Sequence, residues 1–131
     1  EDFKLIDFFT PNETEAEFYL NKKIESEKDI KNASEEFLKK GIKNIIITLG
    51  EKGCYFANEK ESFFINAFKL KEPVLDTTGA GDAFNGALAV GLAKNLDIKQ
   101  ALNFANKVAA ISTTKQGAAT SMPSLDDLEN Y

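Results

Sequence analysis

The stretch with the clearest chemical potential is Asp76-Thr77-Thr78-Gly79-Ala80-Gly81-Asp82, which follows an extended segment and opens an apolar helical run. Gly79 and Gly81 lack a Cβ, so the backbone there can take unusual dihedral angles and come close to a ligand. A helix that begins near Asp82 points unpaired N–H groups and a partial positive charge at this loop. The pattern therefore predicts a phosphate site, where Asp82 either caps the helix or takes a proton from a nearby hydroxyl.

The composition limits which other chemistry is possible. The 131 residues carry a net charge of −5 without a cluster of Lys or Arg, which disfavours nucleic acid and anionic membranes as partners. The chain has no histidine, which excludes Ser-His-Asp and Cys-His catalysis and a His-ligated zinc site. Cys54, the single cysteine, excludes an internal disulfide and fits a reducing compartment, so we expect a cytoplasmic location.

The elements that must position this stretch begin with a short strand over Leu5–Phe9 and a helix from Asn12 to about Leu20. Asn12 and Glu15 have the spacing of a capping box, which is one reading of the pair. The other reading is that the same two groups hold a phosphate or a hydrated Mg²⁺. A second helix is predicted over Ser26–Lys40, with Gly41 as its stop.

The middle of the chain reads as strands. Asn44–Leu49 is a β-branched run typical of an interior strand, and Cys54–Ala57 with Ser62–Phe68 predicts a hairpin. Gly50-Glu51-Lys52-Gly53 lies between the first two of these strands. Turn geometry alone explains its glycines; the alternative is that Thr48 and the loop amides contact a nucleotide.

The second half reads as paired helices. Ala83–Lys94 is rich in small residues, so we expect a buried helix packed closely against another backbone. Asp97 caps a longer helix from Ile98 to about Thr114, and Ser124 starts a short terminal helix. Together the elements predict an α/β fold: part of a mostly parallel sheet flanked by helices, with an antiparallel hairpin. Ligands of such sheets gather at the carboxyl ends of strands.

Two known glycine motifs that bind phosphate can be excluded from the sequence. The chain has no P-loop, and a dinucleotide fingerprint needs glycine at position 84, which is Phe84. The stretch Asp76–Gly86 instead resembles the second signature of the ribokinase-like, or phosphofructokinase-B, carbohydrate kinases. Thr10–Glu15 resembles the Asn-x-x-Glu motif of that family, Ile47–Gly53 its nucleotide loop, and Lys115–Pro123 its C-terminal segment. The resemblance covers essentially the whole chain, in order.

The resemblance implies a role for each matching residue. Asp82 would be the base that takes the proton of the sugar hydroxyl, and the amides of Gly79, Ala80 and Gly81 would form an anion hole. Glu15 would order the water around Mg²⁺. The implied ATP site comprises Asn12, Thr48, Leu49, Gly50, Glu51, Lys52, Gly53, Gly81, Asp82 and Asn106. The positions that would frame a monovalent cation, normally K⁺, are Asp76, Thr78, Ser112, Lys115, Gly117 and Ser121.

The implied activity is transfer of the γ-phosphoryl group of ATP to a primary hydroxyl of a sugar, with D-ribose and ribose 5-phosphate as the expected pair. Other substrates of the family stay open: fructose, 2-keto-3-deoxygluconate, a nucleoside or an aminoimidazole. A different class, a non-catalytic nucleotide-binding module, is disfavoured because binding alone does not need Asp82.

Family members are longer than this chain. We expect residues 1–131 to be the C-terminal part of a single kinase domain, without the N-terminal half that carries the lid and most sugar contacts. The chain also begins at Glu1 without a methionine. The piece alone should be nearly inactive and should expose a sheet edge and apolar surface. The full-length protein is expected to be a homodimer.

Overall fold

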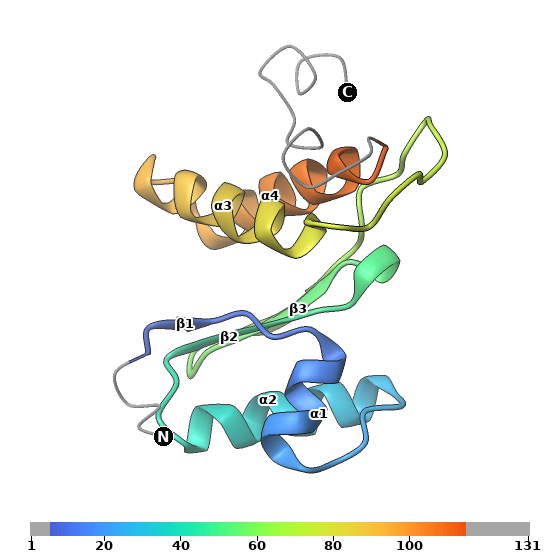
Figure 1. Ribbon diagram of the computed structural model, residues 1–131. Helices are drawn as coiled ribbons and strands as arrows, with labels where there is room; N and C mark the ends of the chain where they lie inside the picture. The colour runs from blue at the N-terminus through green and yellow to red at the C-terminus, as the bar shows by residue number, and fades with distance from the viewer. Residues whose placement is uncertain (1–5, 115–131) are drawn as a thin grey trace. The chain divides into compact units, whose positions relative to one another are not determined.

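The computed structural model describes residues 6–114, which divide between two compact units at residues 66 and 67 (Figure 1). In the first unit, β1 (Phe8–Phe9), β2 (Asn44–Thr48), β3 (Cys54–Ala57) and β4 (Ser62–Ile65) form one sheet in that order. β1 pairs with β2 in parallel, and β2–β3 and β3–β4 are antiparallel. The α/β class and the hairpin are confirmed, and in this part of the chain the sheet is mixed.

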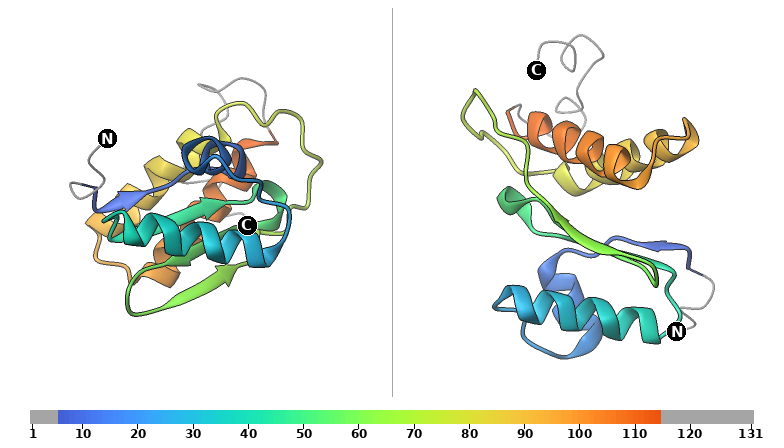
Figure 2. Two further views of the ribbon diagram at one scale, coloured as in Figure 1. Left: turned by 90° about the horizontal axis from the view of Figure 1, so that it is seen from below. Right: turned by 180° about the vertical axis from the view of Figure 1, so that it is seen from behind.

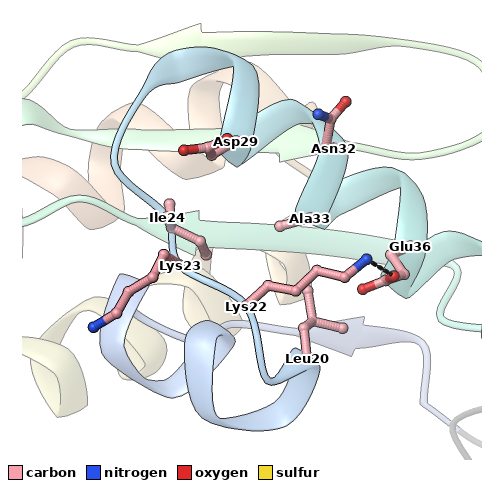
Figure 3. Close-up of a pocket in the computed structure, with 8 residues that line it drawn as sticks. All are labelled: Leu20, Lys22, Lys23, Ile24, Asp29, Asn32, Ala33 and Glu36. Atoms are coloured by element: carbon pink, nitrogen blue, oxygen red, sulfur yellow. Dashed lines mark hydrogen bonds and ion pairs between the residues drawn. The ribbon is translucent and has the colours of Figure 1, made fainter.

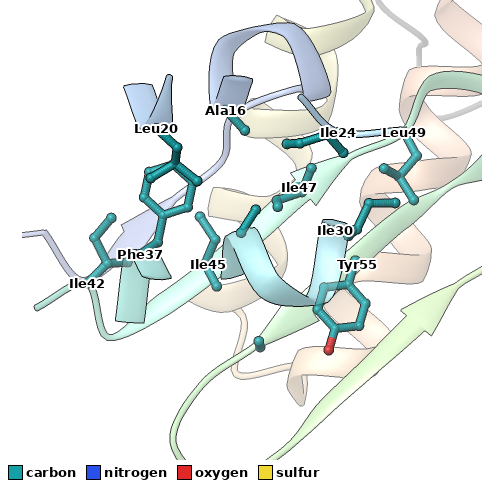
Figure 4. Packing of buried hydrophobic residues seen from close by; sticks show 12 residues of the cluster. Ala16, Leu20, Ile24, Ile30, Phe37, Ile42, Ile45, Ile47, Leu49 and Tyr55 are labelled. Atoms are coloured by element: carbon teal, nitrogen blue, oxygen red, sulfur yellow. The ribbon is translucent and has the colours of Figure 1, made fainter. Parts of the chain in front are cut away.

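Helices α1 (Glu13–Leu20) and α2 (Glu27–Lys39) connect β1 to β2 and cover the same face of the sheet (Figure 2). Their contact with the sheet forms an apolar core, in which Phe37 of α2 is fully buried and lies beside Leu20 of α1 and Ile45 of β2 (Figure 4). Gly41, at φ 108°, follows α2 in a conformation that favours glycine, as the stop signal predicts. The order strand–helices–strand brings the ends of β1 and β2 side by side.

Two strands are shorter than predicted. Within the described residues the first strand holds only Phe8–Phe9, and the hairpin strand ends at Ile65 rather than Phe68. The hairpin is closed by Asn58, whose side-chain oxygen accepts the N–H groups of Lys60 and Glu61, each at 2.9 Å. These bonds fix the turn and so the register in which Cys54 faces Ile65.

The second unit is a pair of helices, α3 (Ala80–Ala93) and α4 (Ile98–Ser112), packed against each other. Asp97 caps α4, as predicted, and the Gln100 side chain completes a capping box. The expectation that α3 is buried holds for one face only. Ala83, Phe84, Ala87, Leu88 and Gly91 are buried, whereas Gly86, Ala89 and Val90 are exposed. None of the helices within residues 6–114 is long and apolar enough to cross a bilayer.

Candidate active site

The predicted nucleotide loop lies at the carboxyl end of β2, beside the start of α1. Asn12 and Thr48 form an isolated parallel bridge, and the Thr48 N–H donates to the Pro11 carbonyl at 2.9 Å. The sequence motifs at positions 10–15 and 47–53, far apart along the chain, are therefore adjacent within the first unit. This placement is the one predicted for ligand-binding loops of α/β sheets.

The loop that follows β2 is held by its own backbone. Residues Gly50–Lys52 form a 3₁₀ turn, closed by a hydrogen bond of 2.8 Å from the Leu49 N–H to the Gly53 carbonyl. Gly50 has φ 61° and Gly53 has φ 102°, both in the region that favours glycine. The turn reading of these glycines is confirmed, and it leaves a nucleotide role open.

Asn12 and Glu15 form the predicted capping box. The Asn12 side-chain oxygen accepts the Glu15 N–H at 2.8 Å, and a Glu15 carboxylate oxygen accepts the Asn12 N–H at 2.9 Å. Each side chain is exposed and has a second polar atom that bonds to no described residue. Capping and ligand binding are thus compatible: Nδ2 of Asn12 can donate to a phosphate while Oε2 of Glu15 accepts from water.

The signature stretch forms a turn that leads into α3 in the second unit. Gly79 is the residue before the helix, at φ 81°, and the helix begins at Ala80, slightly earlier than the predicted start near Asp82. The N–H of Ala80 donates to the Thr77 carbonyl at 3.2 Å. Among the described residues, the N–H groups of Gly79, Gly81 and Asp82 have no acceptor. Three free donors at a helix N-terminus form an anion site, and the Asp82 amide is a member that the sequence motif did not suggest.

The Asp82 carboxylate lies in the first turn of α3, exposed. It makes no hydrogen bond or ion pair with the part of the chain that the structure describes. The capping role left open by the sequence is not used, because no side chain caps this helix. A free carboxylate next to free amides can accept a proton from an alcohol whose phosphate partner the amides hold.

The segment before the signature is anchored to the end of α4. The Thr113 carbonyl accepts the N–H groups of Leu75 at 2.7 Å and Asp76 at 3.1 Å. The Asp76 carboxylate in turn accepts the Thr78 N–H at 2.8 Å, which sets the turn toward Gly79. Sequence analysis missed Thr113, because a backbone acceptor leaves no mark in residue type.

The remaining predicted residues divide into three groups. Ser112 is buried at the end of α4, where its hydroxyl donates to the Ala109 carbonyl at 2.7 Å. Asn106 is also on α4 and only 8% exposed, so an adenosine contact there needs a ligand that reaches a nearly covered side chain. Lys115, Gly117, Ser121 and the predicted helix from Ser124 lie outside the described residues.

A pocket of about 140 Å³ lies in the first unit, between the end of α1 and α2 (Figure 3). Leu20, Ile24 and Ala33 form its apolar part, and an ion pair joins Lys22 to Glu36 at its rim. None of its lining residues belongs to the predicted site. Within residues 6–114, no cluster of three or more His, Cys, Asp or Glu side chains could hold a metal ion.

The α/β fold, with glycine-bearing loops at the end of β2 and at the start of α3, is of the ribokinase-like class. The family model described as pfkB family carbohydrate kinase matches residues 2–125. The chain belongs to the pfkB family of carbohydrate kinases.

The matched relatives agree with this placement. The ribokinase of Staphylococcus aureus is 41% identical over 129 residues, which cover 98% of this chain and 42% of that protein. The deoxyribokinase of Salmonella typhi is 36% identical over 125 residues, covering 95% of this chain and 40% of that protein. This chain therefore spans about two fifths of the length of these relatives.

Solved structures show the same fold. The ribokinase of Thermotoga maritima superposes with a TM-score of 0.86 at 37% identity, over 98% of this chain and 42% of that one. The ribokinase of Arabidopsis thaliana, solved in complex with ribose and ATP, gives a TM-score of 0.92 at 29% identity, over 98% and 41% of the two chains.

Proposed function

We propose that the kinase to which this chain belongs transfers the γ-phosphoryl group of ATP to the primary hydroxyl of D-ribose, giving ribose 5-phosphate. The observation that carries the proposal is the exposed Asp82 carboxylate, close in sequence to the N–H groups of Gly79 and Gly81, since none of these groups has a partner among residues 6–114. A site that only binds phosphate gains nothing from a carboxylate there, because the two negative groups repel.

Asp82 acts as the base of this reaction. It accepts the proton of the sugar hydroxyl as a bond forms between that oxygen and the γ-phosphorus. The bond from the γ-phosphorus to its bridging oxygen breaks, and ADP leaves with the electron pair. A base of this kind contributes about 10²–10⁴-fold to the rate.

The amides of Gly79 and Gly81 stabilise the charge that develops on the transferred group, which is worth about 10²–10³-fold per donor in comparable sites. Ala80 joins them only when its N–H leaves the Thr77 carbonyl. The Asp82 N–H adds a further donor. Asn12 and the loop Thr48–Gly53 bind ATP, with Asn106 toward its adenosine end.

The residues present could hold the Mg²⁺ and K⁺ that the family uses, although the described residues contain no cluster of acidic side chains. Glu15 would hold Mg²⁺ through water, since one carboxylate oxygen is open and Mg²⁺ keeps several waters. K⁺ would be framed by Asp76, Thr78, Ser112, Lys115, Gly117 and Ser121, mostly through neutral oxygens. When bound, the two ions supply positive charge near the phosphates. A solved relative, a putative ribokinase of Escherichia coli, holds ATP and Mg²⁺, and the phosphofructokinase-2 of that organism holds potassium.

Ribose is proposed because curated relatives with about 40% identity are ribokinases, and a relative with the same fold was solved with ribose and ATP. A deoxyribokinase has only slightly lower sequence identity to this chain, so deoxyribose is the main alternative substrate. We further propose that the chain forms the C-terminal, nucleotide-binding part of a cytoplasmic homodimeric kinase and is nearly inactive alone.

The test uses a chimera in which this chain replaces the matched stretch of the Staphylococcus aureus ribokinase. With ATP, Mg²⁺ and K⁺, the chimera is expected to phosphorylate ribose, with the phosphate on O5 by ³¹P and ¹³C NMR, which tests phosphoryl transfer by this chain because the borrowed half supplies most of the sugar contacts. The 131-residue chain alone is the matched control and should release no ADP in response to ribose. A chimera that binds ATP but phosphorylates no sugar contradicts the proposal.

A further inference from the structure

The pocket between the end of α1 and α2 is lined by no residue of the proposed phosphoryl-transfer site (Figure 3). Leu20, Ile24 and Ala33 form its apolar part, and each of them is at most 9% exposed. Its volume of about 140 Å³ is close to that of an engineered cavity of about 150 Å³ that holds benzene. The apolar part therefore has room for a branched side chain of about four to six carbons.

Side chains of both charges line the polar part of the pocket. Lys22 and Glu36 form an ion pair with each other. Lys23, on the segment after α1, makes no hydrogen bond or ion pair with residues 6–114. In Asp29, on α2, Oδ2 accepts the Glu25 N–H at 2.9 Å, and Oδ1 has no partner among the same residues. The pocket thus offers one ammonium group and one carboxylate oxygen to a ligand.

These two charges select the kind of ligand that fits. An anion is attracted by Lys23 and repelled by Asp29, and for a cation the signs are reversed. A molecule that carries both charges and an apolar side chain matches both residues and the apolar part. Asn32, which also lines the pocket, makes no hydrogen bond with a described residue through its side-chain amide, and that amide can donate as well as accept.

We propose that this pocket binds a free apolar α-amino acid of the size of leucine. The ammonium group of the amino acid pairs with Asp29, its carboxylate pairs with Lys23, and its side chain occupies the apolar part of the pocket. A residue within a peptide is a poorer ligand, because its backbone carries neither charge. This site goes beyond the proposed kinase activity, which assigns no role to the pocket.

The test is isothermal titration calorimetry of L-leucine into the chimera, without ATP or sugar. We expect a Kd of about 1 mM or lower. Isoamylamine, which is leucine without the carboxylate, and 4-methylpentanoate, which is leucine without the ammonium group, should each bind at least tenfold more weakly. A hydrogen bond between charged groups contributes about tenfold or more to affinity. Glycine should also bind at least tenfold more weakly, because it buries no side chain.

Two substitutions assign the charges of the ligand to the two residues. Lys23→Gln should weaken leucine at least tenfold without weakening isoamylamine, which has no carboxylate for Lys23 to bind. Asp29→Asn should weaken leucine without weakening 4-methylpentanoate, which has no ammonium group. Lys28→Gln and Glu27→Gln are the matched controls, because both residues are exposed on α2 and neither lines the pocket. The controls should bind all ligands like wild type.

Methyl NMR spectra locate the bound leucine, whose addition should shift the resonances of Ile24 and Ala33. Lys23 is exposed, so Lys23→Gln should unfold at the same temperature as wild type, and a loss of affinity then reflects a lost contact. The proposal fails if leucine does not bind at about 10 mM, or if isoamylamine and 4-methylpentanoate bind as tightly as leucine. It also fails if folded Lys23→Gln keeps the wild-type affinity for leucine. None of these measurements requires turnover, so the result is independent of the proposed activity.

Discussion

Replacing Gly81 by alanine should make the chain more stable and the kinase slower. Gly81 lies in the first turn of α3, outside the glycines with positive φ, and a Cβ there would meet no atom within 4 Å. Alanine at such a position stabilises by about 0.4–1 kcal/mol, chiefly through the unfolded chain. The same methyl group occupies the open space beside the Gly81 N–H, where we place the γ-phosphoryl group.

Gly79→Ala is the contrasting substitution two residues earlier. Gly79 has φ 81°, and a residue with a Cβ in the left-handed region costs about 1–2 kcal/mol. The two alanine substitutions should therefore change the unfolding temperature of the chain in opposite directions. Gly81→Ala raises it by a few degrees, and Gly79→Ala lowers it. Gly79→Asn should fall between them, since asparagine tolerates this conformation better.

Thermal and urea unfolding, followed by circular dichroism, measure the stabilities, and coupled ADP release by the chimera measures turnover. Gly81→Ala keeps its N–H, but its methyl group would hold the phosphoryl group away from the donors, so kcat is expected to fall by at least about tenfold; contact with one such donor is worth about 10²–10³-fold. A Gly81→Ala chimera with wild-type turnover would refute the placement of the γ-phosphoryl group beside Gly81. Equal stability of the two alanine variants would refute the backbone geometry assigned to Gly79.

Other substitutions test the packing and the caps. Gly91→Ala should destabilise the α3–α4 pair, measured by urea unfolding, because a Cβ would press on the Ala101 Cα; a gain in stability would contradict the packing. Asn12→Ala should cost about 1 kcal/mol through loss of the cap, while Asn12→Asp, which keeps the cap, should cost less and yet weaken ATP binding in the chimera by calorimetry. Phe37→Ala, in the fully buried core of the first unit, should cost about 3–5 kcal/mol, and a loss below 1 kcal/mol would show that the core is misassigned.

Local signals in the sequence are sufficient to predict most of the helices and strands. The predicted strand Cys54–Ala57 matches the structure to the residue, and the capping box at Asn12 and the cap at Asp97 are confirmed. These features depend on neighbouring residues alone: turn formers at the ends of a short apolar run, or an oxygen-bearing side chain three residues before its partner. The start of α3 was placed late because Gly79 begins the helix through its backbone dihedral angle, with no capping side chain to mark it.

Properties that depend on distant contacts were harder to predict. The small residues of α3 suggested burial all round, yet only one face packs on α4, and small size does not reveal which face has a partner. The Thr113 carbonyl, which fixes Leu75 and Asp76, could not be inferred, since every residue has a carbonyl. The proposed site roles come from the order of the motifs, and the structure adds which amides and carboxylate oxygens have no partner among residues 6–114.

The measurement that decides most directly whether Asp82 is the catalytic base compares Asp82→Asn with wild type in the chimera. Asp29→Asn is a matched control, because Asp29 holds the same position in the first turn of α2 as Asp82 in α3. We predict that Asp82→Asn lowers kcat by about 10²–10⁴-fold while the Kd for ATP stays within a few fold of wild type, and that Asp29→Asn changes neither. Turnover of Asp82→Asn equal to wild type would contradict the proposed role of this carboxylate.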